Sequence, residues 1–397
     1  MRISTSALHA QGLANILLNQ TRLARTQNEL ALGTRLLSAK DDPGAWARAS
    51  GLDQHLAQLE RYRENSSVVQ HRLGLEENAL VSATETLNRV RELALQANNA
   101  TTSAEARLSI AQEMQARIGE LLSVANSADG EGRYLFAGTA DAASPFSLNV
   151  VGATYSGNAS TRLVDIGPER SVPLGDAGDS VFQNLSTGNG TFAVAAGATN
   201  AGLAKLDSAK LADPASWDGG SYTLTFNTGN YEVRDAGNAL IDSGAYTPGA
   251  AIRFRGVDLT LSGAPVDGDT FSVTPSQPQD MFATVQKMVA LFATTPGDAA
   301  ATARHHTEFY GALEELDSAM TRVSTVRATV GHRLNAVDDA LTQIDTIDVQ
   351  AQATLSGLRD LDYAEATTRL NLQMTALQAA QQSYSRIQGL SLFDFLR

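Results

Sequence analysis

The sequence of 397 residues contains no cysteine, and only four of its residues are lysine. Without cysteine the chain has no disulfide, no thiolate metal site and no cysteine nucleophile. This composition suits export to an oxidising exterior. No run of about 18 apolar residues is present, so no membrane span is expected. The N-terminal residues also lack the apolar block of about 7–15 residues that marks a cleaved signal peptide.

Positive charge is also in short supply, because the formal net charge at pH 7 is −13. Nucleic-acid binders need clustered lysine and arginine to contact phosphates. We therefore do not expect a nucleic-acid partner.

Proline and glycine are scarce at both ends of the chain and concentrated in its middle. Eight of the ten prolines and 18 of the 32 glycines lie between residues 141 and 279. Helix interiors disfavour both residue types. The expected fold is therefore mainly α with a β insert: a long-helix bundle or coiled coil made from both chain ends, and an antiparallel β domain in the middle.

A long apolar stripe with alternating spacings of three and four dominates the C-terminal third. Such a stripe predicts a long helix that packs against other helices. Arg327 alone interrupts it; its side chain either reaches water from the edge of the stripe or pairs with an acidic residue across the helix interface. The stripe residues expected to form a rod core are Phe309, Leu313, Leu316, Met320, Val323, Val330, Leu334, Val337, Leu341 and Ile344.

Both chain ends carry weaker heptads, in which one apolar column lies beside a partly polar one. At the N-terminal end the polar members are Gln20, Gln27 and Thr34, which follow Leu13 at intervals of seven. Ordering each residue costs about 1–2 kcal/mol of backbone entropy, and a single leucine column hardly offsets this cost. We expect these ends to be disordered in the monomer and to pair on assembly. The expected interface residues are Leu13, Ile16, Leu23, Leu30, Leu37, Tyr363, Leu370, Leu377, Tyr384 and Ile387.

Local signals divide the chain further. Asp42 and Pro43 suit the N-cap and first position of a helix that ends near Asn98, and Thr102 with Glu105 has capping-box spacing. Helix resumes at Asp280, with the long helix from about His305 and a last helix over about 360–388. Strand alternation marks Tyr222–Phe226, Val257–Leu261 and Phe271–Val273, whereas about 185–215 shows no clear pattern.

We expect three parts from these signals. A terminal coiled-coil segment comprises 1–41 and 348–397. A helical rod comprises 42–140 and 280–347, and a β-rich domain comprises 141–279.

No pattern of catalytic or metal-binding residues is present. The six histidines include no His-Glu-x-x-His, and the sequence has no Gly-x-Ser-x-Gly elbow or phosphate loop. Asp267 and Asp269 flank Gly268, but two carboxylates fall short of the oxygen set that calcium needs. We expect this turn to be a hairpin loop, and we expect no cofactor and no enzymatic activity.

Six segments in order along the chain resemble the hook-associated protein 3 branch of the flagellin-like family. The resemblance is strong over about 1–146 and 280–397 and loose in between. The segments are Arg2–Ser6, Ala39–Pro43, Arg133–Gly138 followed by Pro145 and Phe146, Gly268–Val273, Leu361–Ala366 and Leu390–Arg397.

The resemblance implies a structural adaptor at the flagellar hook–filament junction. It implies export through the flagellar type III apparatus to the cell exterior. The implied partners are hook-associated protein 1, flagellin, further copies of the same chain in a ring, and an export chaperone that binds the C-terminal segment. It also implies that the paired terminal helices line an inner tube and that the variable β domain faces outward. Two alternatives stay open: a flagellin that forms the filament itself, and an extracellular enzyme with a catalytic β insert.

Overall fold

The structure, a computed structural model, describes the backbone of residues 5–99 and 101–393 and the side chains of 7, 9–99 and 101–386. The chain forms two compact units: unit 1 is Met1–Glu64 with Ala340–Arg397, and unit 2 is Asn65–Asp339. The boundaries of these two units differ from those of the three parts expected from the sequence. The division into three parts stays a prediction. Within the described ranges, no helix has the length and apolarity needed to cross a bilayer.

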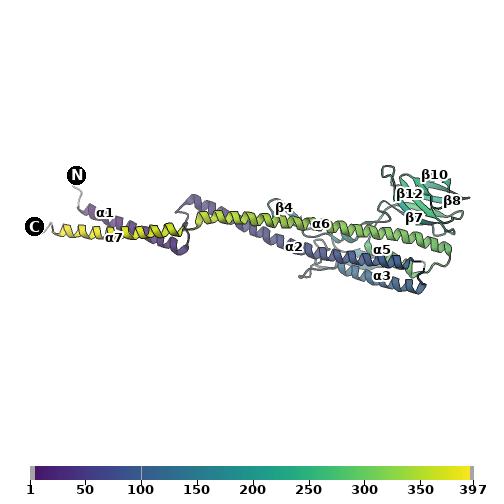
Figure 1. Ribbon diagram of the computed structural model, residues 1–397, viewed down its shortest axis with the longest axis horizontal. Coiled ribbons are helices and arrows are strands. Elements are labelled where there is room, and N and C mark those ends of the chain that lie inside the picture. The colour runs from purple at the N-terminus through teal and green to yellow at the C-terminus, as the bar shows by residue number, and fades with distance from the viewer. Residues whose placement is uncertain (1–4, 100, 394–397) are drawn as a thin grey trace. The chain divides into compact units, whose positions relative to one another are not determined.

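Unit 1 contains α1 (Thr5–Leu32), the start of α2 (Pro43–Ala97), the end of α6 (Ala299–Arg359) and α7 (Tyr363–Phe393). Helices α1 and α7 lie side by side, and the start of α1 and the end of α7 are at the same end of this pair, so the helices are antiparallel (Figure 1). Asp42 Oδ1 accepts the Ala45 N–H at 2.9 Å, which confirms the predicted start of α2. Asp362 caps α7 by accepting the N–H groups of Ala364 and Glu365 at 2.9 and 3.1 Å.

The turn after α1 is tied to the junction between α6 and α7. The Arg35 N–H donates to the Arg359 carbonyl at 2.7 Å, and the Leu361 N–H donates to the Gly33 carbonyl at 3.1 Å. Gly33 has φ +68°, and a Cβ there would lie 2.8 Å from the Tyr363 hydroxyl. The positive φ favours glycine, and a side chain here would also displace the Tyr363 hydroxyl. The end of α1 is therefore fixed against the start of α7.

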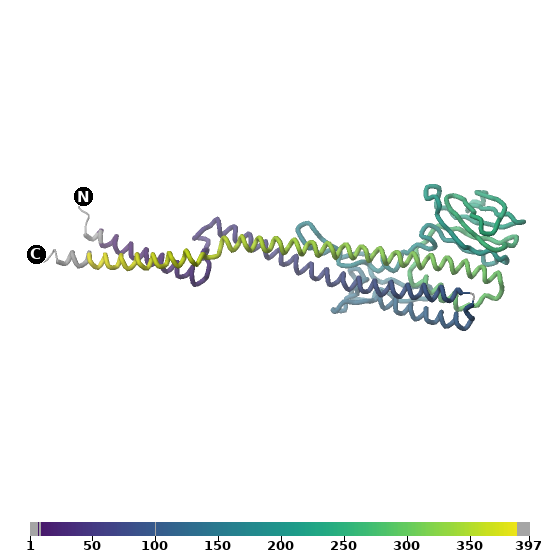
Figure 2. Tube along the Cα trace, viewed as in Figure 1, coloured from purple at the N-terminus to yellow at the C-terminus, as the bar shows by residue number. Residues whose placement is uncertain are grey.

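The helices of unit 2 are residues 65–97 of α2, α3 (Ala104–Ala125), α4 (Gly178–Phe182), α5 (Met281–Ala293) and residues 299–339 of α6. Along α2 the leucines spaced by seven, Leu73, Leu80 and Leu87, are fully buried. Helix resumes at Asp280 as predicted, and Asp280 caps α5 by accepting the Ala283 N–H at 2.7 Å. In Figure 2 the segments of α2, α3 and α6 run alongside one another within this unit.

Two predicted helix starts in unit 2 are wrong. The cap of α3 is Ser103, not Thr102: Ser103 Oγ accepts the Ala106 N–H at 3.2 Å, whereas the Thr102 hydroxyl donates back to the Gln96 carbonyl. The long helix α6 begins at Ala299, not near His305, because Asp298 caps it through the Ala301 N–H at 2.6 Å. In α3 the neighbouring serine takes the cap. In α6 a capping aspartate seven residues before His305 starts the helix about two turns earlier.

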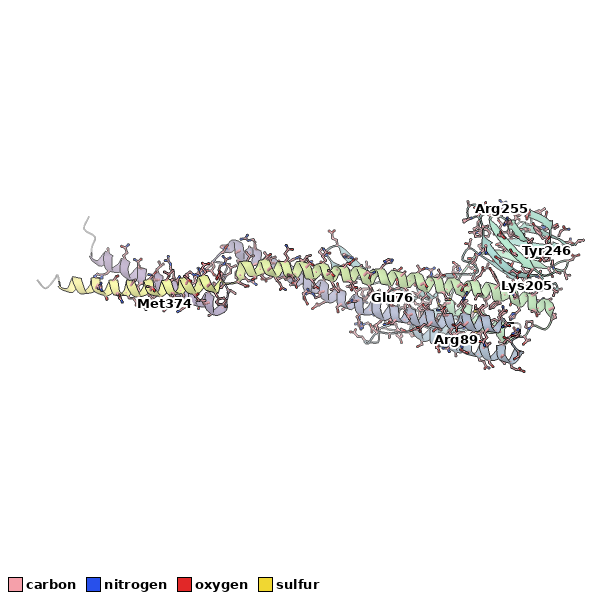
Figure 3. The ribbon with its side chains drawn as sticks, in the orientation of Figure 1. Glu76, Arg89, Lys205, Tyr246, Arg255 and Met374 are labelled. Carbon is pink, nitrogen blue, oxygen red and sulfur yellow. The ribbon has the colours of Figure 1, made fainter. Side chains whose placement is uncertain are left out.

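A β-sandwich occupies part of the insert in unit 2. One sheet has the strand order β10-β9-β8-β13-β6 and the other the order β11-β12-β7, with all pairs antiparallel. Aromatic and aliphatic side chains from both sheets form one buried core, and Tyr246 and Arg255 mark this domain in Figure 3. The strands are β6 (Phe192–Ala196), β7 (Lys205–Leu211), β8 (Tyr222–Asn227), β9 (Asn230–Asp235), β10 (Leu240–Ala245), β11 (Ala251–Phe254), β12 (Val257–Ser262) and β13 (Thr270–Pro275).

The first part of the insert is not in the sandwich but packs on helices. Phe146 of β1 contacts Phe182 of α4 and Phe282 of α5, with ring centroids 5.5 and 5.7 Å apart. Phe136 stacks edge-on against Phe182 at 5.0 Å. The strands of this part are β1 (Phe146–Asn149), β2 (Gly152–Tyr155), β3 (Leu163–Gly167) and β4 (Arg170–Pro173). A separate short pair is formed by β5 (Leu185–Ser186) and β14 (Pro278–Gln279).

The Asp267–Asp269 turn does not close a hairpin, contrary to the prediction. The strands on its two sides, β12 and β13, belong to different sheets. Asp269 is buried, and its carboxylate accepts N–H groups from Ala201, Gly202 and Val266 at 2.8–3.0 Å. The turn therefore joins the two sheets and holds the loop before β7.

Helix α6 covers the free edge of β7. The Leu206 N–H donates to the Thr307 hydroxyl at 3.1 Å, and the Ala209 N–H donates to the Tyr310 hydroxyl at 3.2 Å. Unpaired strand edges invite non-native pairing. These two bonds satisfy part of that edge and attach the sandwich to α6 within unit 2.

Candidate assembly interface

The seam between α1 and α7 is only weakly apolar. Ile16 is buried, and Leu23, Leu30, Leu370 and Leu377 are half-buried. The second column on α1 begins one residue before the predicted one, so it contains Gly12, Asn19 and Thr26 where Leu13, Gln20 and Gln27 were expected.

Gly12 explains this register. The half-buried Tyr384 ring lies so close that a Cβ at Gly12 would be 2.9 Å from Tyr384 Cδ2, and the same ring meets His9 edge-on at 6.0 Å. An aromatic ring facing a glycine lets the two backbones approach closely. Leu13 is consequently turned out of the seam and is 49% exposed.

The other predicted interface residues have mixed positions. Leu37 lies half-buried in the turn after α1, while its neighbour Leu36 is buried. Tyr363 is largely exposed, although its hydroxyl touches Gly33. Ile387 belongs to α7, but its side chain lies outside the described residues.

The predicted stripe on α6 faces inward along its whole length. One column is buried and the other is half-buried, as expected for a helix that packs over a little less than half of its circumference. The buried column contains Phe309, Leu316, Val323, Val330, Val337 and Ile344. The half-buried column contains Leu313, Met320, Leu334 and Leu341.

Arg327 forms an ion pair across the helix interface. Its guanidinium donates to Glu77 Oε1 of α2 at 2.6 and 3.0 Å. The side chains of Arg327 and Glu77 remain 34% and 29% exposed. Arg327 therefore both reaches water from the edge of the stripe and pairs with an acidic residue across the helix interface. A pair this accessible contributes at most about 1 kcal/mol.

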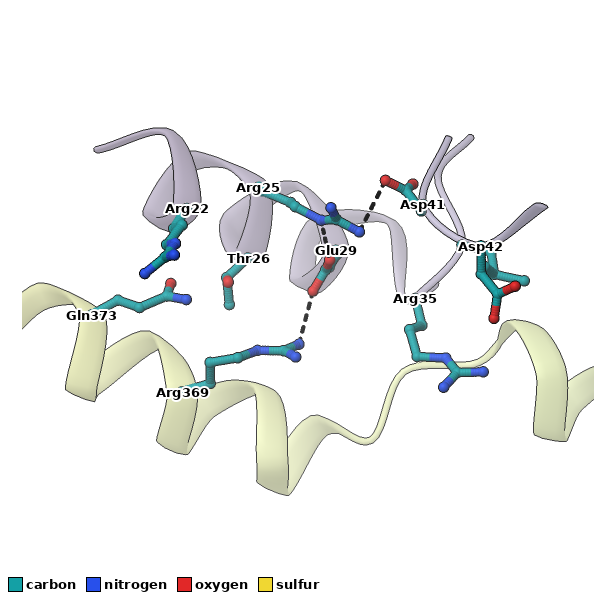
Figure 4. Close-up of a pocket in the computed structure, with 10 residues that line it drawn as sticks. Arg22, Arg25, Thr26, Glu29, Arg35, Asp41, Asp42, Arg369 and Gln373 are labelled. Atoms are coloured by element: carbon teal, nitrogen blue, oxygen red, sulfur yellow. Dashed lines mark hydrogen bonds and ion pairs between the residues drawn. The ribbon is translucent and has the colours of Figure 1, made fainter. Parts of the chain in front are cut away.

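A charge cluster that the heptad pattern did not predict lies in the α1–α7 seam (Figure 4). The Glu29 carboxylate, with a side chain only 6% exposed, accepts from Arg25 at 2.9 Å and from Arg369 of α7 at 2.8 Å. Arg25 also contacts Asp41 at 2.9 Å. Burial of a carboxylate between two guanidinium groups fixes its position and disfavours other alignments of the helices.

A cavity of about 420 Å³ adjoins this cluster, lined by Arg22, Arg35, Asp42 and Gln373 among others. Gln373 Oε1 and Arg369 Nε are buried there, and neither has a hydrogen-bond partner in the described part of the chain. Arg22, Arg369 and Gln373 also line a second, open groove of about 800 Å³, whose far side is formed by α7. Unit 1 therefore has unused hydrogen-bonding capacity beside an open groove.

Large apolar side chains are exposed on both helices of the pair. Leu13, Leu17 and Leu18 of α1 and Leu372 of α7 are 49–67% exposed, and Met374 of α7 is also accessible (Figure 3). Clusters of exposed apolar residues on a helix pair mark a protein-contact surface. The chemistry available in unit 1 is helix-to-helix packing.

Charge is divided unevenly between the units. Unit 1 has 12 acidic and 12 basic residues, whereas unit 2 has 31 acidic and 18 basic residues. The whole formal charge of the chain therefore belongs to unit 2. Unit 1 as a whole has no net formal charge, whereas its terminal helices α1 and α7 together carry four basic and two acidic residues.

The histidines have structural surroundings. Burial lowers the pKa of His305, whose Nε2 lies 3.2 Å from the Leu291 carbonyl oxygen, so the neutral ring can donate to that oxygen. Among the residues that the structure describes, no three His, Asp or Glu side chains are grouped as a metal site would require.

Comparison with known proteins supports a flagellar assignment. The bacterial flagellin N-terminal helical region matches residues 3–141, and the bacterial flagellin C-terminal helical region matches residues 313–396. Flagellar hook-associated protein 3 of Escherichia coli K12 is 26% identical over 397 residues, which cover 99% of each chain.

Solved structures agree. The crystal structure of Xanthomonas campestris FlgL is 36% identical, with a TM-score of 0.72 over 77% of this chain and 99% of that one. The flagellar junction protein FlgL from Legionella pneumophila is 30% identical, with a TM-score of 0.73 over 79% of this chain and all of that one.

Flagellins match less closely over the full length: flagellin B of Vibrio cholerae is 24% identical over 386 residues, 92% of this chain and 89% of that one. Helical ends of the flagellin type, a full-length hook-associated relative and junction-protein structures that the chain covers almost entirely all agree. The chain belongs to the flagellar hook-associated protein 3 family.

Proposed function

We propose that this chain is a structural component of the bacterial flagellum that joins the hook to the filament. The observation that carries the proposal is the α1–α7 pair, which has a weakly apolar seam and leucines exposed outside it. Such a pair buries its apolar surface fully only when further helices cover it. An adaptor between two polymers needs surfaces of this kind.

The proposed partners are hook-associated protein 1 on the hook side and flagellin on the filament side, with further copies of this chain in the same ring. Before assembly, an export chaperone binds the C-terminal segment, and the chain leaves the cell through the flagellar type III apparatus. The absence of cysteine is compatible with passage in an unfolded form to an oxidising exterior.

A non-enzymatic role agrees with the structural character of the family. The flagellin alternative is weaker, because the full-length match to hook-associated protein 3 and the junction-protein structures exceeds the match to flagellins. The enzyme alternative has no observation in its favour among the described residues.

A deletion strain tests the proposal. Cells without this chain should have intact hooks but no filaments, and should shed unpolymerised flagellin into the medium. The intact gene on a plasmid should restore filaments. Filament growth in the deletion strain, or elongation of the purified chain into filaments from a seed, would contradict the junction role and favour the flagellin alternative.

We further propose that α1 and α7 are disordered in the monomer and become ordered on assembly. Hydrogen exchange of the purified chain should then be fast over residues 1–40 and 360–397 and slow over Leu316–Leu341, where the α6 stripe is buried. Slow exchange at both ends would disprove this coupling. The measurement on assembled flagella is the control, because protection should appear there.

A further inference from the structure

We infer that the β-sandwich has two positions: a latch docks it on α6, and it rotates away from α6 about a single neck when the latch is released. The latch consists of Arg304, Thr307 and Tyr310, and the neck is the strand pair β5–β14. This inference goes beyond the proposed function and does not depend on it.

The sandwich has a hydrophobic core of its own. Buried side chains from strands of both sheets form this core. Among the residues that the structure describes, Tyr310 of α6 is the one residue outside the insert that packs against it, and its side chain is only partly buried. A domain with its own core keeps its fold when a contact outside that core is lost.

The chain enters and leaves the sandwich at one place. Strand β5 pairs with β14 over only two residue pairs. Next to these pairs, the Thr187 N–H donates to the Gln277 carbonyl at 3.0 Å, and the Ser276 hydroxyl donates to the Thr187 carbonyl at 2.6 Å. A single narrow connection permits rotation of a domain unless a second contact holds it. The orientation of the sandwich therefore depends on its contact with α6.

The latch holds the sandwich by polar groups on one face of α6. Its three residues are spaced by three along the helix, so they share that face. The Arg304 guanidinium donates to the Asn200 carbonyl in the loop before β7. Thr307 and Tyr310 accept the two N–H groups of β7 described above. Lys205 marks the start of β7 in Figure 3.

The latch is weak enough to open while the sandwich stays folded. A hydrogen bond within a folded protein favours the bonded state by about 5-fold, so three bonds favour the docked position by roughly 100-fold. Each latch bond ends on a backbone group of the sandwich, and water can satisfy that group after release. The docked position is therefore the major one, and the released position has a population of about 1%.

Two spin labels measure the positions, because engineered cysteines would be the only ones in the chain. Ala236→Cys places one label in the exposed turn between β9 and β10, and Ser324→Cys places the other on the exposed side of α6. Electron–electron distance measurements on this full-length chain should give one major distance.

Removal of the two hydroxyls should release the sandwich. Thr307→Val combined with Tyr310→Phe keeps the shapes of both side chains but leaves two N–H groups of β7 without acceptors in the docked position. The released population should rise about 25-fold, because two bonds of about 5-fold each are lost. A second, broader set of distances should then be detectable between the labels.

Hydrogen exchange separates release from unfolding. In the double variant, exchange should become faster over 205–211, because the edge of β7 is no longer covered. Residues 257–262 form β12, which lies between β11 and β7 in the same sheet. Their exchange should keep the rate of the unaltered chain, because the sandwich stays folded.

Tyr246→Phe and Thr321→Val are the matched controls. The Tyr246 hydroxyl bonds to the Leu261 and Gly263 carbonyls inside the sandwich. The Thr321 hydroxyl bonds to the Asp317 carbonyl within α6. Each control removes the same kind of hydroxyl group as the double variant, but neither group lies between the sandwich and α6. Both controls should keep the single distance.

Two results would overturn the inference. A single, unchanged distance in the double variant would mean that other contacts fix the sandwich on α6. Equally accelerated exchange over 257–262 and 205–211 would mean that the sandwich unfolds when the latch is lost and does not move as a body. The junction role is judged separately, by filament restoration in the deletion strain.

Discussion

Asp269→Ala is expected to lower the free energy of unfolding of the sandwich by about 3–5 kcal/mol, because it removes a buried acceptor of several backbone N–H groups. Asp269 is 3% exposed, and its carboxylate accepts the N–H groups of Ala201, Gly202 and Val266. Alanine would leave these N–H groups without their acceptor. Thermal unfolding followed by circular dichroism should show a lower midpoint for this transition.

Asp267 in the same turn is the matched control. It is exposed and accepts one N–H, from Thr228 at 2.6 Å. Asp267→Ala should therefore change the unfolding free energy by about 1 kcal/mol or less. Equal effects of the two substitutions would show that Asp269 does not link the sheets. Faster hydrogen exchange over 200–206 in Asp269→Ala alone would locate the damage.

The second large effect is a pH dependence due to Glu76 on α2 (Figure 3). The pKa of this carboxyl is raised to about 8, chiefly by burial and then by the nearby Asp176 carboxylate, against the lowering effects of the Asp176 N–H and Arg333. Glu76 Oε1 accepts the Asp176 N–H at 3.1 Å, while Oε2 is buried without a partner. The Arg333 guanidinium donates two hydrogen bonds of 2.9 Å to the Asp176 carboxylate. The folded protein thus keeps Glu76 protonated at neutral pH.

The direction of the effect follows from proton binding. An unfolded glutamate releases its proton near pH 4.5 and the folded one near pH 8, so the folded state binds the extra proton between these values. Stability should therefore fall as pH rises through this window, by up to about 1.4 kcal/mol per pH unit, and then level off.

Glu76→Gln should remove most of this slope and raise the unfolding midpoint at pH 8, since glutamine is neutral and retains the acceptor for the Asp176 N–H. Urea unfolding at several pH values from 5 to 9 measures the slope. Glu77→Gln is the control: Glu77 is next in sequence but partly exposed, so the slope should persist. An unchanged slope in Glu76→Gln would show that other groups cause it.

Local chemistry made part of this fold predictable from the sequence. Asp42 with Pro43 and Asp280 are capping residues whose partners are three residues away, so the starts of α2 and α5 needed no tertiary information. The buried column of α6 likewise follows from its period. Strands β8, β12 and β13 follow from alternation, because each has one face on the core.

The features that the sequence did not predict depend mainly on contacts between residues far apart in the chain. The seam register of α1 is decided by Tyr384 against Gly12, and a glycine in a heptad gives no apolar signal. Strand β7 went unnoticed because its pairing register with β12 shifts, so its buried residues Leu206 and Ala209 are three apart and do not alternate. Glu29 is buried only because Arg369 approaches it from α7. In the candidate interface, composition predicted the weakness of the seam, but not which flank of α1 stays open.

The unequal division of charge has a consequence for the chain before it joins a polymer. With 31 acidic against 18 basic residues in unit 2, separate molecules repel one another at distances of about a Debye length, near 10 Å in 0.1 M salt. This field keeps molecules with exposed leucines dispersed. Helices α1 and α7 lack this acidic excess, because together they carry four basic and two acidic residues. In the proposed assembly they can therefore contact a neighbour at short range. Unit 2 thereby provides the repulsion that keeps molecules in solution, while unit 1 provides the surfaces that adhere.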